Sequence, residues 1–125
     1  MQLLANVAVG IVALVHVAIS VAELFLWKRP GVYGRLDRFN FNQDEANKVA
    51  PIVANAGLYN AFIASGLVWS LFATSDSQSL KLFFLSCVVI AGIYGAATLK
   101  RTTLVLQTLP ALLAAFLVWI ANKAA

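Results

Sequence analysis

Glu23 is the one acidic side chain that lies inside an apolar stretch of this 125-residue chain. It sits near the end of the run from Leu3 to Trp27. A carboxylate at the centre of a membrane helix costs roughly 2.5–3.5 kcal/mol on insertion scales, so neighbouring groups must satisfy it or the protein must use it. Its chemistry would be to bind a cation or a protonated ligand, or to act as a general acid or base.

Glu23 shares one helix face with His16, Ser20 and Trp27, because spacings of four, three and four residues follow the helical repeat. Apart from Asn6, the rest of this run is apolar or glycine. A single polar stripe on an apolar helix is expected to face protein rather than lipid. His16 and Glu23 are roughly 10 Å apart along the helix axis, too far to share one metal ion, so no metal site is predicted.

Three further apolar runs carry hydrogen-bonding side chains at a comparable depth. At 1.5 Å per residue, several of these groups lie roughly 6–9 Å below the same membrane boundary as Glu23. We expect them to converge with His16, Ser20 and Glu23 on one polar pocket, lined by Asn55, Tyr59 and Asn60 from the second run, Tyr94 from the third and Gln107 from the fourth. The alternative is a structural network, although such bonds average only about 0.6 kcal/mol in membranes.

The composition indicates a membrane protein. Hydrophobic residues make up 62% of the chain and charged residues 11%, against about 45–50% and about 25% in soluble domains. The single cysteine excludes an intrachain disulfide and a thiolate metal cluster. The net charge of +4 comes from residues that flank the apolar runs and lack an aromatic-interleaved basic face, so no nucleic-acid partner is predicted.

The four apolar runs each approach the roughly 20 residues that a helix needs to cross the hydrocarbon core. They lack the alternating pattern of membrane strands, so helices are predicted over approximately residues 3–27, 43–73, 80–99 and 103–121. Asn42 and Glu45 predict a capping box at the start of the second helix. Short second and third connections require antiparallel neighbours. The expected fold is an all-α, integral membrane, four-helix up-down bundle, forming a single transmembrane domain over residues 1–125.

The distribution of basic residues predicts the orientation. Four spans place both termini and the second connection on one side, which carries two basic residues, against seven on the other side. The seven are Lys28, Arg29, Arg35, Arg38, Lys48, Lys100 and Arg101, and the two are Lys81 and Lys123. Both termini are therefore expected outside the cytoplasm. Trp27, Trp69 and Trp119 lie near helix ends, where tryptophan usually anchors at the membrane interface.

Sequence motifs in three of the helices resemble those of a known family. They are His16 with Glu23-Leu24-Phe25-Leu26-Trp27, then Asn55-Ala56-Gly57-Leu58-Tyr59-Asn60, and finally Leu109-Pro110-Ala111-Leu112-Leu113. Together they resemble the domain-of-unknown-function 1304 family of small four-span bacterial membrane proteins, in which a glutamine more often stands where this chain has Ala56. The resemblance implies a bacterial inner-membrane protein and carries no activity or cofactor.

The architecture is also similar to small multidrug-resistance transporters, which have a key glutamate in their first helix. Such transporters often lack a strong charge bias, so the bias of this chain argues against dual topology.

Three hypotheses for function remain open at this stage. The first is a protein that binds, and through a homo-oligomer transports, a small-molecule ligand or cation held by Glu23. The second is an intramembrane acid/base or redox enzyme acting on a lipophilic substrate such as a quinone or polyene, with His16 or Tyr59 assisting Glu23. The third is a structural or accessory subunit. Membrane lipids are expected partners in each case, and the sequence identifies no cofactor and no catalytic residue.

Overall fold

The structure is a computed structural model that describes residues 1–36 and 38–123. Its helices, several of them continuous with one another, are α1 (Gln2–Val21), η1 (Ala22–Leu26), α2 (Pro30–Tyr33), α3 (Gln43–Phe72), α4 (Ser77–Thr98), η2 (Leu104–Thr108) and α5 (Leu109–Lys123). The segments η1 and η2 are single π-helical turns, and no strand occurs within the described ranges.

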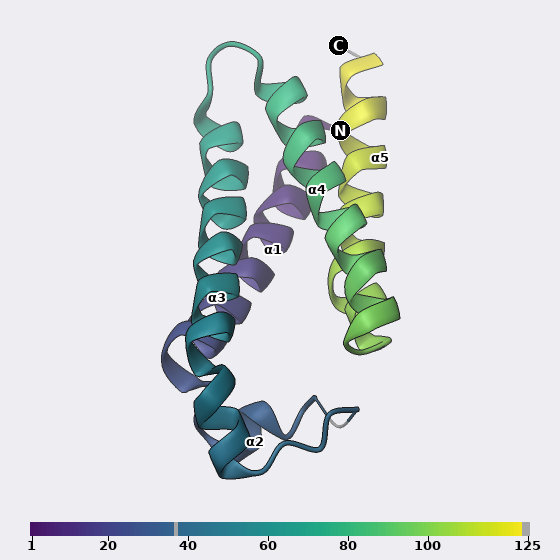
Figure 1. Ribbon diagram of the computed structural model, residues 1–125. Helices are drawn as coiled ribbons and strands as arrows, with labels where there is room; N and C mark the ends of the chain where they lie inside the picture. The colour runs from purple at the N-terminus through teal and green to yellow at the C-terminus, as the bar shows by residue number, and fades with distance from the viewer. Residues whose placement is uncertain (37, 124–125) are drawn as a thin grey trace.

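Four helical segments, at residues 2–26, 43–72, 77–98 and 104–123, are long and apolar enough to cross a membrane. Figure 1 shows the N-terminus, the C-terminus and the connection between α3 and α4 at one end of the molecule, which we call the termini end. The short helix α2 lies at the opposite end, here called the loop end. Consecutive spans run in opposite directions, so the predicted all-α four-helix membrane bundle is confirmed.

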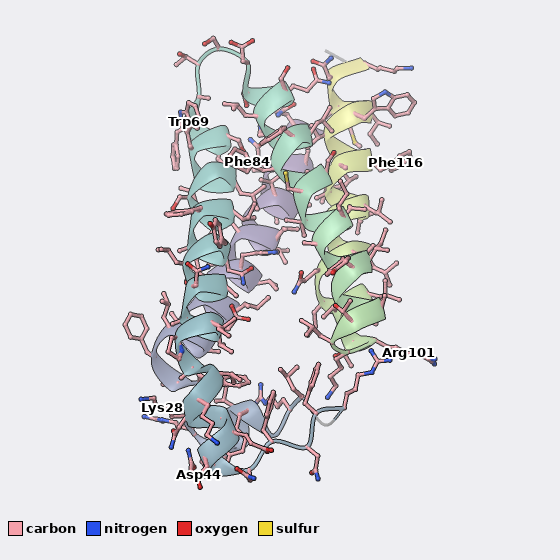
Figure 2. The ribbon with its side chains drawn as sticks, viewed as in Figure 1. Lys28, Asp44, Trp69, Phe84, Arg101 and Phe116 are labelled. Carbon is pink, nitrogen blue, oxygen red and sulfur yellow. The ribbon has the colours of Figure 1, made fainter. Side chains whose placement is uncertain are left out.

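The helices pack through small and medium-sized apolar side chains. Helix α1 packs against α3 and α5, and α4 packs against the same two helices. The buried core between them includes Ala5, Val9, Val12, Leu67, Leu85, Val88, Ala111, Ala114 and Val118. Large apolar side chains point outward instead, as Trp69 and Phe116 do in Figure 2. This distribution suits a protein whose solvent is lipid, because lipid gives helices no hydrophobic reason to bury large residues between them.

The capping box predicted at the start of α3 is present. The side-chain oxygen of Asn42 accepts a hydrogen bond from the backbone N–H of Glu45 at 2.9 Å, and the Glu45 carboxylate accepts one from the backbone N–H of Asn42 at 3.0 Å. These bonds satisfy backbone donors that have no partner within the helix. Helix α3 therefore begins well before its apolar part and extends the bundle at the loop end.

Replacing the capping residue should weaken this extension. We expect Asn42→Ala to lower the free energy of unfolding by about 1 kcal/mol, within the range of about 0.5–2 measured for lost N-caps. Thermal unfolding in a mild detergent measures the loss, and hydrogen exchange should show faster exchange confined to the first turn of α3. Lys48→Ala, at an exposed position of the same helix, is the control. Equal stability of the two variants would contradict the prediction.

Both π-helical turns lie next to residues that the sequence singles out. Pro110 has no N–H to donate to the Leu106 carbonyl one turn earlier, and the wider turn η2 ends two residues before it. The turn η1 contains Glu23 itself. Single π-helical turns often occur at functional sites, so the local geometry of η1 supports Glu23 as a candidate functional residue.

The position of Trp27 near a helix end predicts an exposed side chain at the membrane interface, but the structure places this side chain elsewhere. Its side chain is buried, and its indole N–H donates to the Ala46 carbonyl at 2.8 Å. The rings of Tyr33 and Phe41 pack against it edge to face. The connection between α1 and α3 folds back over the indole, so Trp27 ties the end of the first span to the start of the second. Trp69 remains exposed.

Candidate functional site

The centre of the candidate site is a hydrogen bond between the first and second spans. The Glu23 carboxyl group is half-buried, and its Oε2 accepts a hydrogen bond from Asn60 Nδ2 at 2.9 Å. The same amide nitrogen also donates to the Ala56 carbonyl at 3.2 Å. Within residues 1–36 and 38–123, Asn60 is the one polar partner of Glu23. Asn60 is thus fixed at both of its amide hydrogens and holds one carboxylate oxygen in place.

Gly57 allows this contact to form. A Cβ atom added at Gly57 would lie 2.9 Å from Glu23 Cβ, 3.0 Å from Leu24 Cγ and 3.1 Å from the Leu24 backbone nitrogen. Helix α3 therefore touches η1 at a position where only hydrogen fits. Asn60 follows three residues later, about 60° from Gly57 around the helix, so it lies on the same face.

Asn55 and Tyr59, which we expected beside Glu23, lie on another face of α3. Each is two residues from Gly57 and so is rotated by about 200° from the contact. Asn55 is exposed, and Tyr59 is 61% exposed with its ring packed edge to face on Phe62. The expected convergence therefore fails at these two positions, because the approach of η1 to Gly57 fixes the rotation of α3.

Tyr94 and Gln107 do not join the carboxylate either. Tyr94 is 71% exposed on α4. Gln107 belongs to η2, where its Cβ lies 3.2 Å from the place that a Cβ on Gly92 would occupy. The turn η1 packs chiefly on α3 and α1, whereas η2 packs on α4 and α5. The partner of Glu23 consequently comes from one neighbouring span rather than from all three.

His16 and Ser20, the other members of the polar stripe, are both buried. The Nδ1–H of His16 donates to the Val12 carbonyl of its own helix at 2.9 Å. Ser20 lines a separate hollow of about 450 Å³ between α1 and α3, together with Val17, Ala61, Ala64 and Trp69 among others. The stripe thus faces protein, as its pattern predicted, but His16 and Ser20 do not share a site with Glu23.

A hollow of about 520 Å³ adjoins Glu23 on the side of the loop end. Its lining comes from η1, from the residues that follow η1, and from the first half of α3: Glu23, Leu24, Phe25, Trp27, Lys28, Asn47, Ala50, Pro51 and Ala54. Asn47 and Lys28 are polar lining residues that our sequence analysis did not select. The sequence does contain a signal for one wall of this hollow. Spacings of three, four and three residues form one helical stripe, made of Asn47, Ala50, Ala54 and Gly57.

The donors around Glu23 do not resemble a metal centre. No group of three or more His, Cys, Asp or Glu residues that could hold a metal ion occurs within the described residues. The arrangement is instead a carboxylate with one amide donor, set beside a hollow of mixed polar and apolar lining. Chemically, it can accept further hydrogen bonds or attract a positive charge.

Comparison with known proteins gives one positive result. The sequence model of a family described as protein of unknown function (DUF1304) matches residues 10–119. Comparisons with curated proteins and with solved structures find no significant match. The matched region includes Glu23, Gly57, Asn60 and the hollow beside them, together with most of all four spans. Since the match covers nearly all of the 125 residues, the chain belongs to the DUF1304 family.

Proposed function

We propose that this protein binds a small organic cation, or a ligand with a protonated amine, at Glu23. One observation carries the proposal: a carboxylate within a membrane span, held by a single amide donor, lines a hollow at the loop end. Ionisable groups inside membrane spans are rare and usually mark ligand or ion pathways.

The carboxylate keeps capacity for a ligand. An ionised carboxylate has about four lone-pair sites, and Asn60 occupies one of them on Oε2. No Lys, Arg or His side chain of the described residues bonds to Glu23. Phe25 adds an aromatic ring to the lining, and aromatic faces attract organic cations. A lipophilic cation would pair with the Glu23 carboxylate and contact the apolar part of a lining that also includes Lys28.

The location that we propose follows from the family resemblance and from the basic residues. Seven of the nine Lys and Arg residues fall on the side of the loop end, which by the positive-inside rule is cytoplasmic. We therefore place the protein in the bacterial inner membrane with both termini outside the cytoplasm and the Glu23 hollow open to the cytoplasm. Transport, as an extension of binding, needs an exit past the apolar core at the termini end, which a homo-oligomer would have to supply.

Removing the charge of Glu23 tests the proposal. We expect Glu23→Gln to weaken binding of tetraphenylphosphonium to the purified protein by about tenfold or more, because a nearby opposite charge in a low-dielectric site is worth several kcal/mol. Isothermal titration calorimetry in an uncharged detergent measures the affinity. Asp44→Asn makes the same change of charge at an exposed position of α3 and should bind like the unchanged protein.

Other outcomes separate the competing hypotheses. If tetraphenylphosphonium binds neither protein, or binds Glu23→Gln as tightly as the unchanged protein, the carboxylate is not a cation site. A variant that loses only stability would support the accessory-subunit hypothesis instead. Reconstituted vesicles with a proton or tetraphenylphosphonium gradient then test transport. The enzyme hypothesis names His16 or Tyr59 as the partner of Glu23, whereas the hydrogen bond of the carboxylate comes from Asn60.

A further inference from the structure

A second charged group lies buried at the termini end, far along the bundle from Glu23. Lys81, in the second turn of α4, is only 2% exposed. Its ammonium donates to the side-chain oxygen of Asn6 on α1 at 2.8 Å. The same oxygen also accepts a hydrogen bond from Gln2 at 3.3 Å. Lys81 entered the prediction of orientation only as one of the basic residues on this side of the membrane, so its burial is a new feature.

The charge of Lys81 is not balanced by the described part of the protein. An ammonium group has three donors, and Asn6 is a single neutral acceptor. Asp76, which precedes Lys81 by five residues, is exposed and forms no ion pair with it. Asp44 and Glu45 lie at the other end of α3. Buried charges in proteins are normally paired, so Lys81 is suited to an anion that the described residues do not supply.

The surroundings of Lys81 provide a place for that anion. A hollow of about 160 Å³ is lined by Lys81, Gln2, Ser77, Gln78 and Asn122, with Val118 as its one apolar member. Three of these side chains are amides that can donate hydrogen bonds, and no carboxylate is among them. The Ser77 hydroxyl already donates to the Ser70 carbonyl at 2.8 Å. A cavity of about 150 Å³ holds a molecule the size of benzene. The hollow therefore suits one small anionic group and is too small for a nucleotide.

The start of α4 adjoins the hollow. No side chain caps this helix, and Asp76 at its N-cap position adopts a left-handed conformation, with φ of 57°. Ser77 and Gln78, the first two residues of the helix, both line the hollow. The N-terminus of a 22-residue helix carries a partial positive charge and free backbone N–H groups.

We propose that the termini end holds an oxyanion site for a phosphate group, with the Lys81 ammonium as its charged ligand and the amides of Gln78 and Asn122 as further donors. The phosphate belongs either to a free anion or to the headgroup of a phospholipid. Either source supplies the same tetrahedral oxygens, and a lysine with several neutral donors recognises that chemistry. The site is independent of the cation site proposed at Glu23.

Binding measurements on purified protein in an uncharged detergent test the proposal. One arm titrates delipidated protein with inorganic phosphate at constant ionic strength, and a second follows phosphatidylglycerol by native mass spectrometry, with diacylglycerol as the phosphate-free control. We expect Lys81→Met to lower the affinity for whichever phosphate compound binds by about tenfold or more, the effect of losing a charge-assisted hydrogen bond. Lys48→Met, an exposed lysine near the loop end, should bind like the unchanged protein.

Each result has a defined meaning. Binding of inorganic phosphate identifies a site for a soluble anion, and binding of phosphatidylglycerol alone identifies a headgroup site. Failure of both to bind the unchanged protein, or equal affinity in Lys81→Met, overturns the proposal. If Lys81→Met does not fold, the pair Gln78→Ala and Asn122→Ala replaces it, and unchanged affinity in both then overturns the proposal. Glu23→Gln should leave phosphate binding intact, so this site and the cation site can fail separately.

Discussion

Gly57→Ala should destabilise the bundle and weaken the candidate site together. The added methyl group would lie 2.9 Å from Glu23 Cβ and 3.1 Å from the backbone nitrogen of Leu24, so α3 and η1 must move apart. Overpacking of this kind costs about 1–3 kcal/mol, and the better helix propensity of alanine returns only about 0.5–1 kcal/mol. The shift also moves Asn60 away from the carboxylate. We therefore expect a lower unfolding temperature in detergent and weaker tetraphenylphosphonium binding.

Gly10→Ala is a matched control for this experiment. It makes the same substitution in α1, where an added Cβ would have nothing within 4 Å. Because alanine favours the helix, this variant should be as stable as the unchanged protein or slightly more stable. The two variants differ mainly in the atoms that surround the added methyl group. Equal unfolding temperatures for Gly57→Ala and Gly10→Ala would show that the spans do not meet at Gly57.

Gly92→Ala should have a comparable effect on the opposite pair of helices. A Cβ atom at Gly92 would overlap the hydroxyl oxygen of Thr108 and lie 3.0 Å from the Thr108 backbone nitrogen. That hydroxyl is buried and has no hydrogen-bond partner within the described residues. We expect a loss of about 1–3 kcal/mol in the free energy of unfolding. Thermal unfolding in detergent measures it, with tetraphenylphosphonium binding retained because this contact lies away from Glu23.

A double-mutant cycle with Thr108→Ala shows whether the overlap is the cause. Removing the hydroxyl frees the space that the new methyl group needs, so Gly92→Ala in the Thr108→Ala background should cost about 1 kcal/mol less than in the unchanged protein. The backbone contact remains, so the recovery is partial. Strict additivity of the two changes would contradict the close approach of α4 and η2 at this position.

The architecture of the bundle follows from patterns that act over short distances along the chain. The four apolar runs are each long enough to cross the bilayer, and short connections force neighbouring spans to run antiparallel. The capping box at Asn42 and Glu45 is likewise local, since it depends on residue types three positions apart. The wide turns η1 and η2 carry weaker signals. Pro110 indicates an irregular turn near η2, but no residue type in Ala22–Leu26 predicts a π-helical turn.

The candidate site is harder to predict, because depth in the membrane says nothing about rotation around a helix axis. Depth selected Asn55, Tyr94 and Gln107 as the residues level with Glu23, yet Asn60 is the residue that reaches it. The contact at Gly57 decides which residues of α3 face Glu23, and this glycine can be read from the sequence. Taking Gly57 as the contact point would have selected Asn60 over Asn55 and Tyr59. The burial of Lys81 had no comparable signal, because it depends on Asn6, 75 residues away along the chain.

The enclosure of Trp27 makes this chain convenient for optical work. Trp69 and Trp119 are exposed, and Trp27 is 5% exposed and lines the hollow beside Glu23. Replacing the two outer indoles by phenylalanine would leave one intrinsic fluorophore, shielded from quenchers carried by lipid tails and placed where a bound molecule would change its emission. The fold thus contains its own spectroscopic probe, at the same junction where the first two spans are tied together.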